Sequence, residues 1–376
     1  MAALFFVNGF MFSNWLPRIP EVRDRLGVGN GGLGTALIGG GIGGLVASTL
    51  ASRVFGRFNS RPVVTTAALS LAALLPFISL VPSPLSLMAL LSALGFLDVF
   101  NDLAMNTQGM IVQERLGRSI MHRLHAGWSL GFTTGALFGS LASAAKIPMG
   151  LHLSLVAAVL IVTVVTARPH LAPDDPRPDA EPATGADPPL TKFVISKMVV
   201  AMAIMAVGVG FLEVAPNDWS AVALRDLFHA TRWQGIGAVV FASFMLLGRL
   251  GGDHVLERIG VRSLITTALG LSVAGAAVVV TARSMPVAVA GFALWGLGVS
   301  VMFPQLYTMA AKLPGTSAGA GLGAMAVGQR SGFLLTPVIV GQLSDWKGLR
   351  VAFTVIAALA GMFVVTTRRI VAPSST

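Results

Sequence analysis

Ionisable side chains interrupt several long apolar runs of this chain. Asp98 and Asp102 lie in the fourth run along the sequence, Glu213 and Asp218 in the seventh, and Arg330 in the eleventh. Removing a charge from water is costly, so an ionisable group in such surroundings is by default functional. A carboxylate there can bind a cation or a proton. Arg330 is expected to pair with Asp102, with Glu213 or with an anionic group of a solute.

Three polar residues of the fourth run form a stripe. Asp98, Asp102 and Asn106 are four residues apart, so they share one face of a helix, which is expected to face a cavity or another helix instead of lipid. Asp102 lies near the middle of its apolar run. We predict that its carboxylate binds and releases a proton, and that this proton is coupled to the function of the protein. Glu213 is the second candidate, because Pro216 removes a backbone donor nearby and is expected to kink the helix.

Polar and aromatic residues suggest a solute site. Asn14-Trp15 in the first run has a counterpart in Asp218-Trp219 of the seventh run. Aromatic faces stack on sugar-like or cationic solutes, and amides bind hydroxyl groups. Alternatively, the tryptophans lie in the belt at the membrane interface. The predicted solute-binding residues are Asn14, Trp15, Asp98, Asn106, Trp128, Asn217, Trp219, Gln305, Gln329 and Arg330.

The composition indicates a membrane protein. The chain of 376 residues is 54% hydrophobic and 11% charged, with a mean hydropathy of +0.78, whereas soluble proteins have about 25% charged residues. The apolar runs are continuous, which favours helices over a barrel. We predict an all-α protein with twelve transmembrane helices, at 1–22, 30–52, 62–81, 84–113, 121–144, 148–167, 194–224, 232–256, 262–281, 286–311, 316–342 and 349–367.

The chain contains an internal repeat. The segment 57–61 recurs as 258–262, and 127–132 recurs as 328–333, each 201 residues later. Two related halves are typical of secondary transporters, which bind their substrate at the interface between the repeats. The predicted units are an N-terminal six-helix bundle over 1–168, a polar cytoplasmic linker over 169–191 and a C-terminal six-helix bundle over 192–376.

The basic residues orient the chain. Fifteen lysines and arginines fall in one set of predicted loops and nine in the other, which places both termini in the cytoplasm. The sequence has no cysteine, so disulfides and thiolate metal sites are excluded. No nucleotide-binding loop, metal site or hydrolytic triad is recognisable. We therefore predict no cofactor, no bound metal and no enzymatic activity, and we expect an ion gradient to supply the energy.

One segment resembles a family motif. Residues 248–253 followed by 258–262 resemble the loop motif of the major facilitator superfamily. The resemblance implies the two-bundle fold of that family and a charge-paired latch on the cytoplasmic side. The first-half copy departs from the motif, with Ser52 at the position of Asp253. Alternatively, the arginines only set the topology. The predicted gating residues are Arg57, Arg61, Asp253, Arg258 and Arg262.

Further motifs resemble the MosC-like and YbjJ-like branch of this superfamily. They occupy 5–9 with 15–21, 102–109, 117–118 with 125–131, and 218–221. That branch includes a proposed carrier of rhizopine, an inositol-derived amine, so the resemblance implies a small polar solute. It also implies a bacterial cytoplasmic membrane protein, which we expect to be a monomer with no nucleic-acid partner.

We therefore predict proton-coupled uptake of a polyol, sugar or amine derivative. One alternative is proton-antiport efflux of an amphiphilic compound. Gly131, Gly135 and Gly139 resemble part of the antiporter motif of drug exporters, but Ala136 stands where that motif has proline. A second alternative is a non-transporting membrane receptor, but it would need a signalling domain outside the membrane, and the linker is too short and too polar for that role.

Overall fold

The computed structural model describes residues 1–376 except 119, 174–195, 315 and 372–376, and the described residues form helices and connecting turns. The helical segments of the N-terminal half are α1 (Ala2–Trp15), η1 (Leu16–Arg18), α2 (Ile19–Leu26), α3 (Asn30–Arg57), α4 (Ser60–Leu74), η2 (Leu75–Ser79), α5 (Pro84–Leu116), α6 (Met121–Ala144), α7 (Met149–Ala167) and η3 (Arg168–His170). Those of the C-terminal half are α8 (Lys197–Phe228), α9 (Ile236–Thr281), α10 (Met285–Val299), α11 (Met302–Ala311), α12 (Ala318–Lys347) and α13 (Leu349–Val371).

The described helices account for the twelve predicted membrane passes. Eight helical segments are long and apolar enough to cross a membrane by themselves. The other four passes are formed by α1, α6, the first part of α9 and α12, which are shorter or richer in glycine and polar residues. Of these, α6, α9 and α12 pack against the opposite half. Less of their surface can therefore face lipid.

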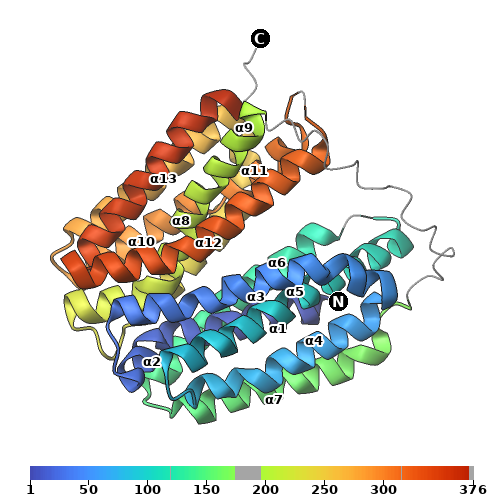
Figure 1. Ribbon diagram of the computed structural model, residues 1–376, viewed down its shortest axis with the longest axis horizontal. Coiled ribbons are helices and arrows are strands. Elements are labelled where there is room, and N and C mark those ends of the chain that lie inside the picture. Colours follow the sequence, from blue (N-terminus) through green and yellow to red (C-terminus); the bar gives the residue numbers. More distant parts are fainter. Residues whose placement is uncertain (119, 174–195, 315, 372–376) are drawn as a thin grey trace.

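The two halves converge at one end of the molecule and diverge toward the other (Figure 1). Contacts between them are made chiefly by α3 with α12 and by α6 with α9. The end that carries α2 is the closed end. The opposite end, where α1 begins and α13 ends, is the open end.

Breaks in the helices follow from local sequence. The first pass bends through η1, where Pro17 cannot donate a hydrogen bond. The eighth and ninth passes both lie in α9. Gly260, which has a positive φ of 74°, breaks this helix and separates the two passes. The helix α8 runs through Pro216 as one segment.

Close packing of α3 on α12 depends on glycine. A Cβ atom on Gly34 would lie 2.1 Å from the carbonyl oxygen of Pro337, and one on Gly341 would lie 2.4 Å from that of Asn30. Only a residue without a side chain allows this approach between helix backbones.

The predicted linker at 169–191 lies largely outside the described residues. Its beginning packs against the N-terminal half, where the Gln108 side chain donates to the carbonyl oxygen of Ala172 at 3.1 Å and Arg115 donates to that of Pro173 at 2.6 Å. Leu171 and Ala172 at the start of the predicted linker are therefore buried, and the bounds of the linker stay a prediction.

Candidate solute site and gates

A polar cluster joins three helices of the N-terminal half. The indole N–H of Trp128 on α6 donates to Asn8 Oδ1 on α1 at 2.7 Å. The Asn8 amide donates to Asp98 Oδ1 on α5 at 3.5 Å. Asn8 therefore connects Trp128 with Asp98, both of which were predicted from the sequence. Asn8 itself lies in the motif at 5–9 but was not predicted as a site residue.

Asp102 and Asn106 continue the stripe along α5. Asn106 donates to Asp102 Oδ1 at 2.9 Å. Asp102 is exposed although it lies well inside its helix, and His125 on α6 acts on it electrostatically. The predicted stripe of Asp98, Asp102 and Asn106 is thus a feature of one helix face, with the middle carboxylate accessible to solvent.

The C-terminal half presents a second polar group. The hydroxyl of Tyr307 on α11 donates to Gln329 Oε1 on α12 at 3.1 Å. Tyr307 is 47% exposed, and its electrostatic neighbours are Asp102, Glu213 and Arg330. Polar residues of the two halves therefore face one another. Tyr307 is the only tyrosine of the chain, and no spacing rule singled it out.

The ion pair predicted for Arg330 is not present in this conformation. The guanidinium of Arg330 donates to the Ser48 hydroxyl on α3. Glu213 instead lies 3.8 Å from Arg249 on α9, which also donates to Ser129 Oγ of α6 at 3.4 Å. Arg249 thus joins the carboxylate on α8 to the other half. Arg249, and not Arg330, pairs with Glu213 because of how the helices are rotated about their axes. Arg249 on α9 points toward α8, whereas Arg330 on α12 points toward α3.

Several other predicted solute-binding residues are buried in this conformation. Asn14 and Trp219 are 0% exposed, and Trp15 is 7% exposed. Asn14 binds His152 inside the N-terminal half, and the indole N–H of Trp219 has no hydrogen-bond partner among the described residues. The part of Asn14-Trp15 and Asp218-Trp219 in solute binding stays a prediction.

The remaining predicted solute residues lie on the expected helices. Gln305 is 8% exposed on α11, and Asn217 is half-buried on α8. Neither belongs to the polar groups described above. Their part in solute binding stays a prediction.

Two reciprocal ion pairs cross the closed end. Arg23 Nη1 of α2 lies 2.5 Å from Asp226 Oδ2 of α8, and Arg225 of α8 pairs with Asp24 of α2. The hydrogen bond to Asp226 raises the pKa of Arg23 above its ordinary value. The dipeptides Arg23-Asp24 and Arg225-Asp226 are 202 positions apart, one more than the repeat offset of 201, so each half contributes one Arg-Asp dipeptide from nearly equivalent positions. We call these four residues the reciprocal clasp.

A carboxylate of the C-terminal half caps a helix of the N-terminal half. Asp345 accepts hydrogen bonds from the backbone N–H groups of Asn30 at 2.9 Å and Gly31 at 2.8 Å. These are unpaired donors at the first turn of α3, where a negative charge is stabilised. Asp345 therefore holds α12 against α3 at the closed end.

The predicted latch residues lie at the open end. Arg57, Arg258 and Arg262 are exposed, and Arg61 donates to the carbonyl oxygen of Arg168 at 3.2 Å. The side chain of Asp253 lies outside the described residues. The latch stays a prediction.

The profile of the Major Facilitator Superfamily matches residues 1–337. The chain belongs to this family. It is a multi-pass membrane protein with the major facilitator fold, and because the family consists of transporters it is not an enzyme. The predicted fold class and family are confirmed.

Two similar proteins cover almost the whole chain. An uncharacterized transporter of this superfamily from Yersinia pestis is 30% identical over 359 residues, which is 94% of this chain and 91% of that protein. The membrane protein MosC of Rhizobium meliloti is 29% identical over 378 residues, which is 96% of this chain and 89% of MosC. The predicted similarity to MosC is confirmed.

Solved structures support the fold. The nucleoside transporter NupG superposes with a TM-score of 0.79, covering 99% of this chain and 98% of NupG at 14% identity. A D-xylose-proton symporter superposes with a TM-score of 0.71, covering 98% of this chain and 94% of the symporter, also at 14% identity. At this identity the likeness shows the shared fold of these carriers.

Proposed function

We propose that the protein takes up a small polar organic solute, a polyol, sugar or amine derivative, across the bacterial cytoplasmic membrane by proton-coupled alternating access. The observation that carries this proposal is the exposed carboxylate of Asp102, set beside Asn106 and facing Tyr307 of the other half. Carboxylate, amide and phenol groups suit a hydroxylated or cationic solute. The fold neighbours named as carriers of nucleosides and D-xylose are compatible with such cargo.

The solute site in this proposal lies between α5 and α6 of one half and α11 and α12 of the other. The N-terminal half contributes carboxylates and the indole of Trp128, which suit a cationic or sugar-like group. The C-terminal half contributes Tyr307, Gln329 and Arg330, which suit hydroxyl or anionic groups. Asn14, Trp15 and Trp219 would contribute only in a conformation that exposes them.

Asp102 is the proposed coupling residue, and Glu213 is the reserve. Asp102 is exposed in this conformation, so it can exchange a proton with the water at the open end. His125 is close enough to act on it and can take part in that exchange. Glu213 already has a charged partner in Arg249. A proton on Glu213 would have to compete with that ion pair, so we rank Glu213 second.

The proposed orientation places both termini in the cytoplasm, because basic residues are enriched in the loops on that side. The closed end is then periplasmic, and the structure corresponds to an inward-open carrier. In the opposite conformation the latch of Asp253 with Arg57, Arg61, Arg258 and Arg262 would hold the cytoplasmic side. We propose that one chain is the transporting unit, because each half supplies part of the site.

Efflux of an amphiphilic compound by proton antiport is the rival function. The glycine stripe that suggested it packs directly against α1, since a Cβ atom on Gly131 would lie 1.9 Å from the carbonyl oxygen of Phe6 and one on Gly139 would lie 2.1 Å from that of Asn14. Helix packing therefore accounts for the stripe. A receptor without transport activity stays the third hypothesis.

The test begins with a thermal-shift screen of the purified protein against polyols, sugars and amines, because a ligand that binds only the folded state raises the apparent stability. A stabilising compound is then assayed in proteoliposomes with an imposed pH gradient. We expect accumulation by the parent protein, and we expect Asp102→Asn to keep solute exchange but lose accumulation. Glu114→Gln, an exposed change near the end of the same helix, should behave like the parent.

Full accumulation by Asp102→Asn would contradict the assignment of the proton site. Export against the solute gradient, with protons moving inward, would instead establish the efflux function. Binding without any solute movement would favour the receptor.

A further inference from the structure

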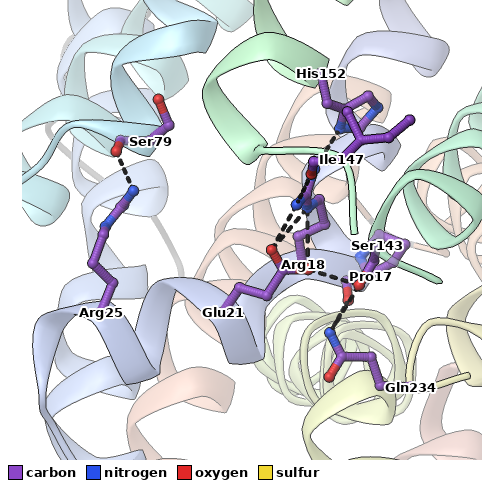
Figure 2. Close-up of polar contacts among 9 residues, drawn as sticks. All are labelled: Pro17, Arg18, Glu21, Arg25, Ser79, Ser143, Ile147, His152 and Gln234. Carbon is purple, nitrogen blue, oxygen red and sulfur yellow. Dashed lines mark hydrogen bonds and ion pairs between the residues drawn. The ribbon is translucent and has the colours of Figure 1, made fainter. Parts of the chain in front are cut away.

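A buried guanidinium lies at the bend of the first membrane pass. Arg18 in η1 is 2% exposed, and each of its three side-chain nitrogens has a polar partner (Figure 2). Its Nε and Nη2 atoms donate to the carboxylate of Glu21 at 3.1 Å and 2.6 Å, and Nη2 also donates to the carbonyl oxygen of Ile147 at 2.7 Å. Its Nη1 atom faces His152 Nδ1 at 3.2 Å. A buried charge is stable only when it has an ionic partner and further hydrogen bonds of this kind.

The contacts of His152 fix its protonation state. An arginine can only donate, so His152 Nδ1 must carry a lone pair. On the other side of the ring, Nε2 lies 3.0 Å from Asn14 Oδ1. The amide nitrogen of Asn14 donates to the carbonyl oxygen of Phe10 at 2.6 Å, which leaves Oδ1 as the acceptor and Nε2 as the donor. His152 is therefore the neutral tautomer with its proton on Nε2.

The same group of residues extends to the other half of the molecule. Ser143 on α6 donates to Glu21 Oε1 at 2.6 Å. Gln234, which precedes α9, donates to Ser143 Oγ at 3.2 Å and to the carbonyl oxygen of Pro17 at 3.4 Å. Gln234 is 3% exposed, so this junction between the halves is shielded from water. Opening the closed end must break it.

We propose that Arg18, Glu21 and His152 form a proton-sensitive lock, in which only a neutral His152 allows the two halves to close at this end. We call these three residues the closed-end lock. It is separate from the carboxylates proposed to couple transport. It rests on the proposed function in one respect, namely that the closed end opens during the transport cycle.

Protonation would disrupt the lock at a defined atom. A proton on His152 Nδ1 would place an N–H group opposite the N–H group of Arg18, with two positive charges side by side. Among the described residues, the charged groups facing His152 are Arg18 from η1 and Glu21 from α2. Glu21 is already neutralised by Arg18, so it cannot compensate. When Arg18 moves, Glu21 loses its partner and the junction of Ser143 with Gln234 is released.

The test measures the closed end directly. The chain has no native cysteine, so Ala145→Cys and Thr231→Cys introduce two spin labels at exposed positions of the two halves. Their separation is measured by pulsed electron resonance on the purified full-length protein in nanodiscs, without solute. Both faces then have the same pH, so the result depends neither on membrane orientation nor on solute identity.

The expected response follows from linkage. If His152 takes up a proton only in the open state, with the usual histidine pKa of about 6.5, lowering the pH from about 7.5 to about 5.5 should raise the ratio of open to closed molecules roughly tenfold. His152→Gln cannot be protonated, so its ratio should not change with pH in this range. His170→Gln changes a second histidine, in η3 at the end of the same pass, and should keep the response of the parent.

Two results would overturn the lock. One is a parent protein whose label separation does not change with pH, and the other is His152→Gln with the same response as the parent. If the glutamine variant does not fold, His152→Asn is measured instead, because its amide oxygen can accept from Arg18 at the place of Nδ1. Failure of these measurements leaves the solute and coupling assignments untouched, since neither enters the experiment.

Discussion

Glu213 and Arg249 provide a test at the level of single residues. Because these partners lie 3.8 Å apart and are only partly exposed, removing one charge leaves the other poorly compensated. We expect a coupling energy of at least about 0.5 kcal/mol between Glu213→Gln and Arg249→Met in a double-mutant cycle. Thermal unfolding of the purified proteins measures it.

The pair Glu213 and Arg330 is the matched control. Arg330 donates to Ser48 in this conformation, so its cycle with Glu213 should be additive within about 0.5 kcal/mol. Strong coupling of Glu213 with Arg330 and none with Arg249 would contradict the pairing described here and would restore the pairing expected from the sequence.

The sequence indicated which residues carry charge inside the membrane, but not their partners. The spacing of Asp98, Asp102 and Asn106 was enough to place them on one face, because the helix period fixes it. The partner of Glu213 depends on how α8 and α9 are rotated against each other, which no local pattern encodes. Arg249 lies in the loop motif at 248–253. The sequence therefore suggested a role for it in that motif and gave no sign of its contact with Glu213.

At the scale of elements, the apolar runs predicted the membrane passes with boundaries a few residues from those of the structure. Length and hydropathy suffice for this, since a pass must span the bilayer. The bend of the first pass at η1 was not predicted, although Pro17 marks it. The burial of Asn14 was not predicted either, because it depends on His152 from α7.

The packing of α3 on α12 gives a prediction for one element. Gly34→Ala would place a methyl group against the carbonyl oxygen of Pro337, and overpacking of this kind costs about 1–3 kcal/mol. Gly40 lies on the same helix with open space around its Cβ position, so Gly40→Ala should be neutral or stabilise by up to about 1 kcal/mol. Gly34→Ala should therefore lower the melting temperature, whereas Gly40→Ala should not. Equal melting temperatures would refute the close approach of these helices.

At the scale of the whole molecule, the internal repeat has two structural consequences. It places two related bundles side by side (Figure 1), and it supplies the two Arg-Asp dipeptides of the reciprocal clasp. The repeat was visible in the sequence, and so were the dipeptides. Their pairing was not, because a sequence repeat identifies equivalent positions in the two halves and does not state which positions meet across the interface.

The reciprocal clasp gives a prediction for the balance between closed and open molecules. Its side chains are partly exposed to water, so each pair should contribute about 0.2–1 kcal/mol to the closed state and less at high salt. Arg23→Asp replaces one attraction with a repulsion against Asp226. We expect this variant to raise the ratio of open to closed molecules several-fold at low salt, measured with the spin labels at positions 145 and 231.

Exchanging the charges of Arg23 and Asp226 tests whether their attraction itself, and not a change in their surroundings, holds the two halves together. A chain with Arg23→Asp and Asp226→Arg keeps opposite charges at both positions, so it should close nearly as well as the parent, whereas Asp226→Arg alone should open like Arg23→Asp. Rising salt should reduce the difference between the single variants and the parent. If the exchanged chain stays as open as the single variants, the Arg23 and Asp226 charges do not hold the two halves together. Closure would then rest on the other contacts across this end, which include the Arg225–Asp24 pair.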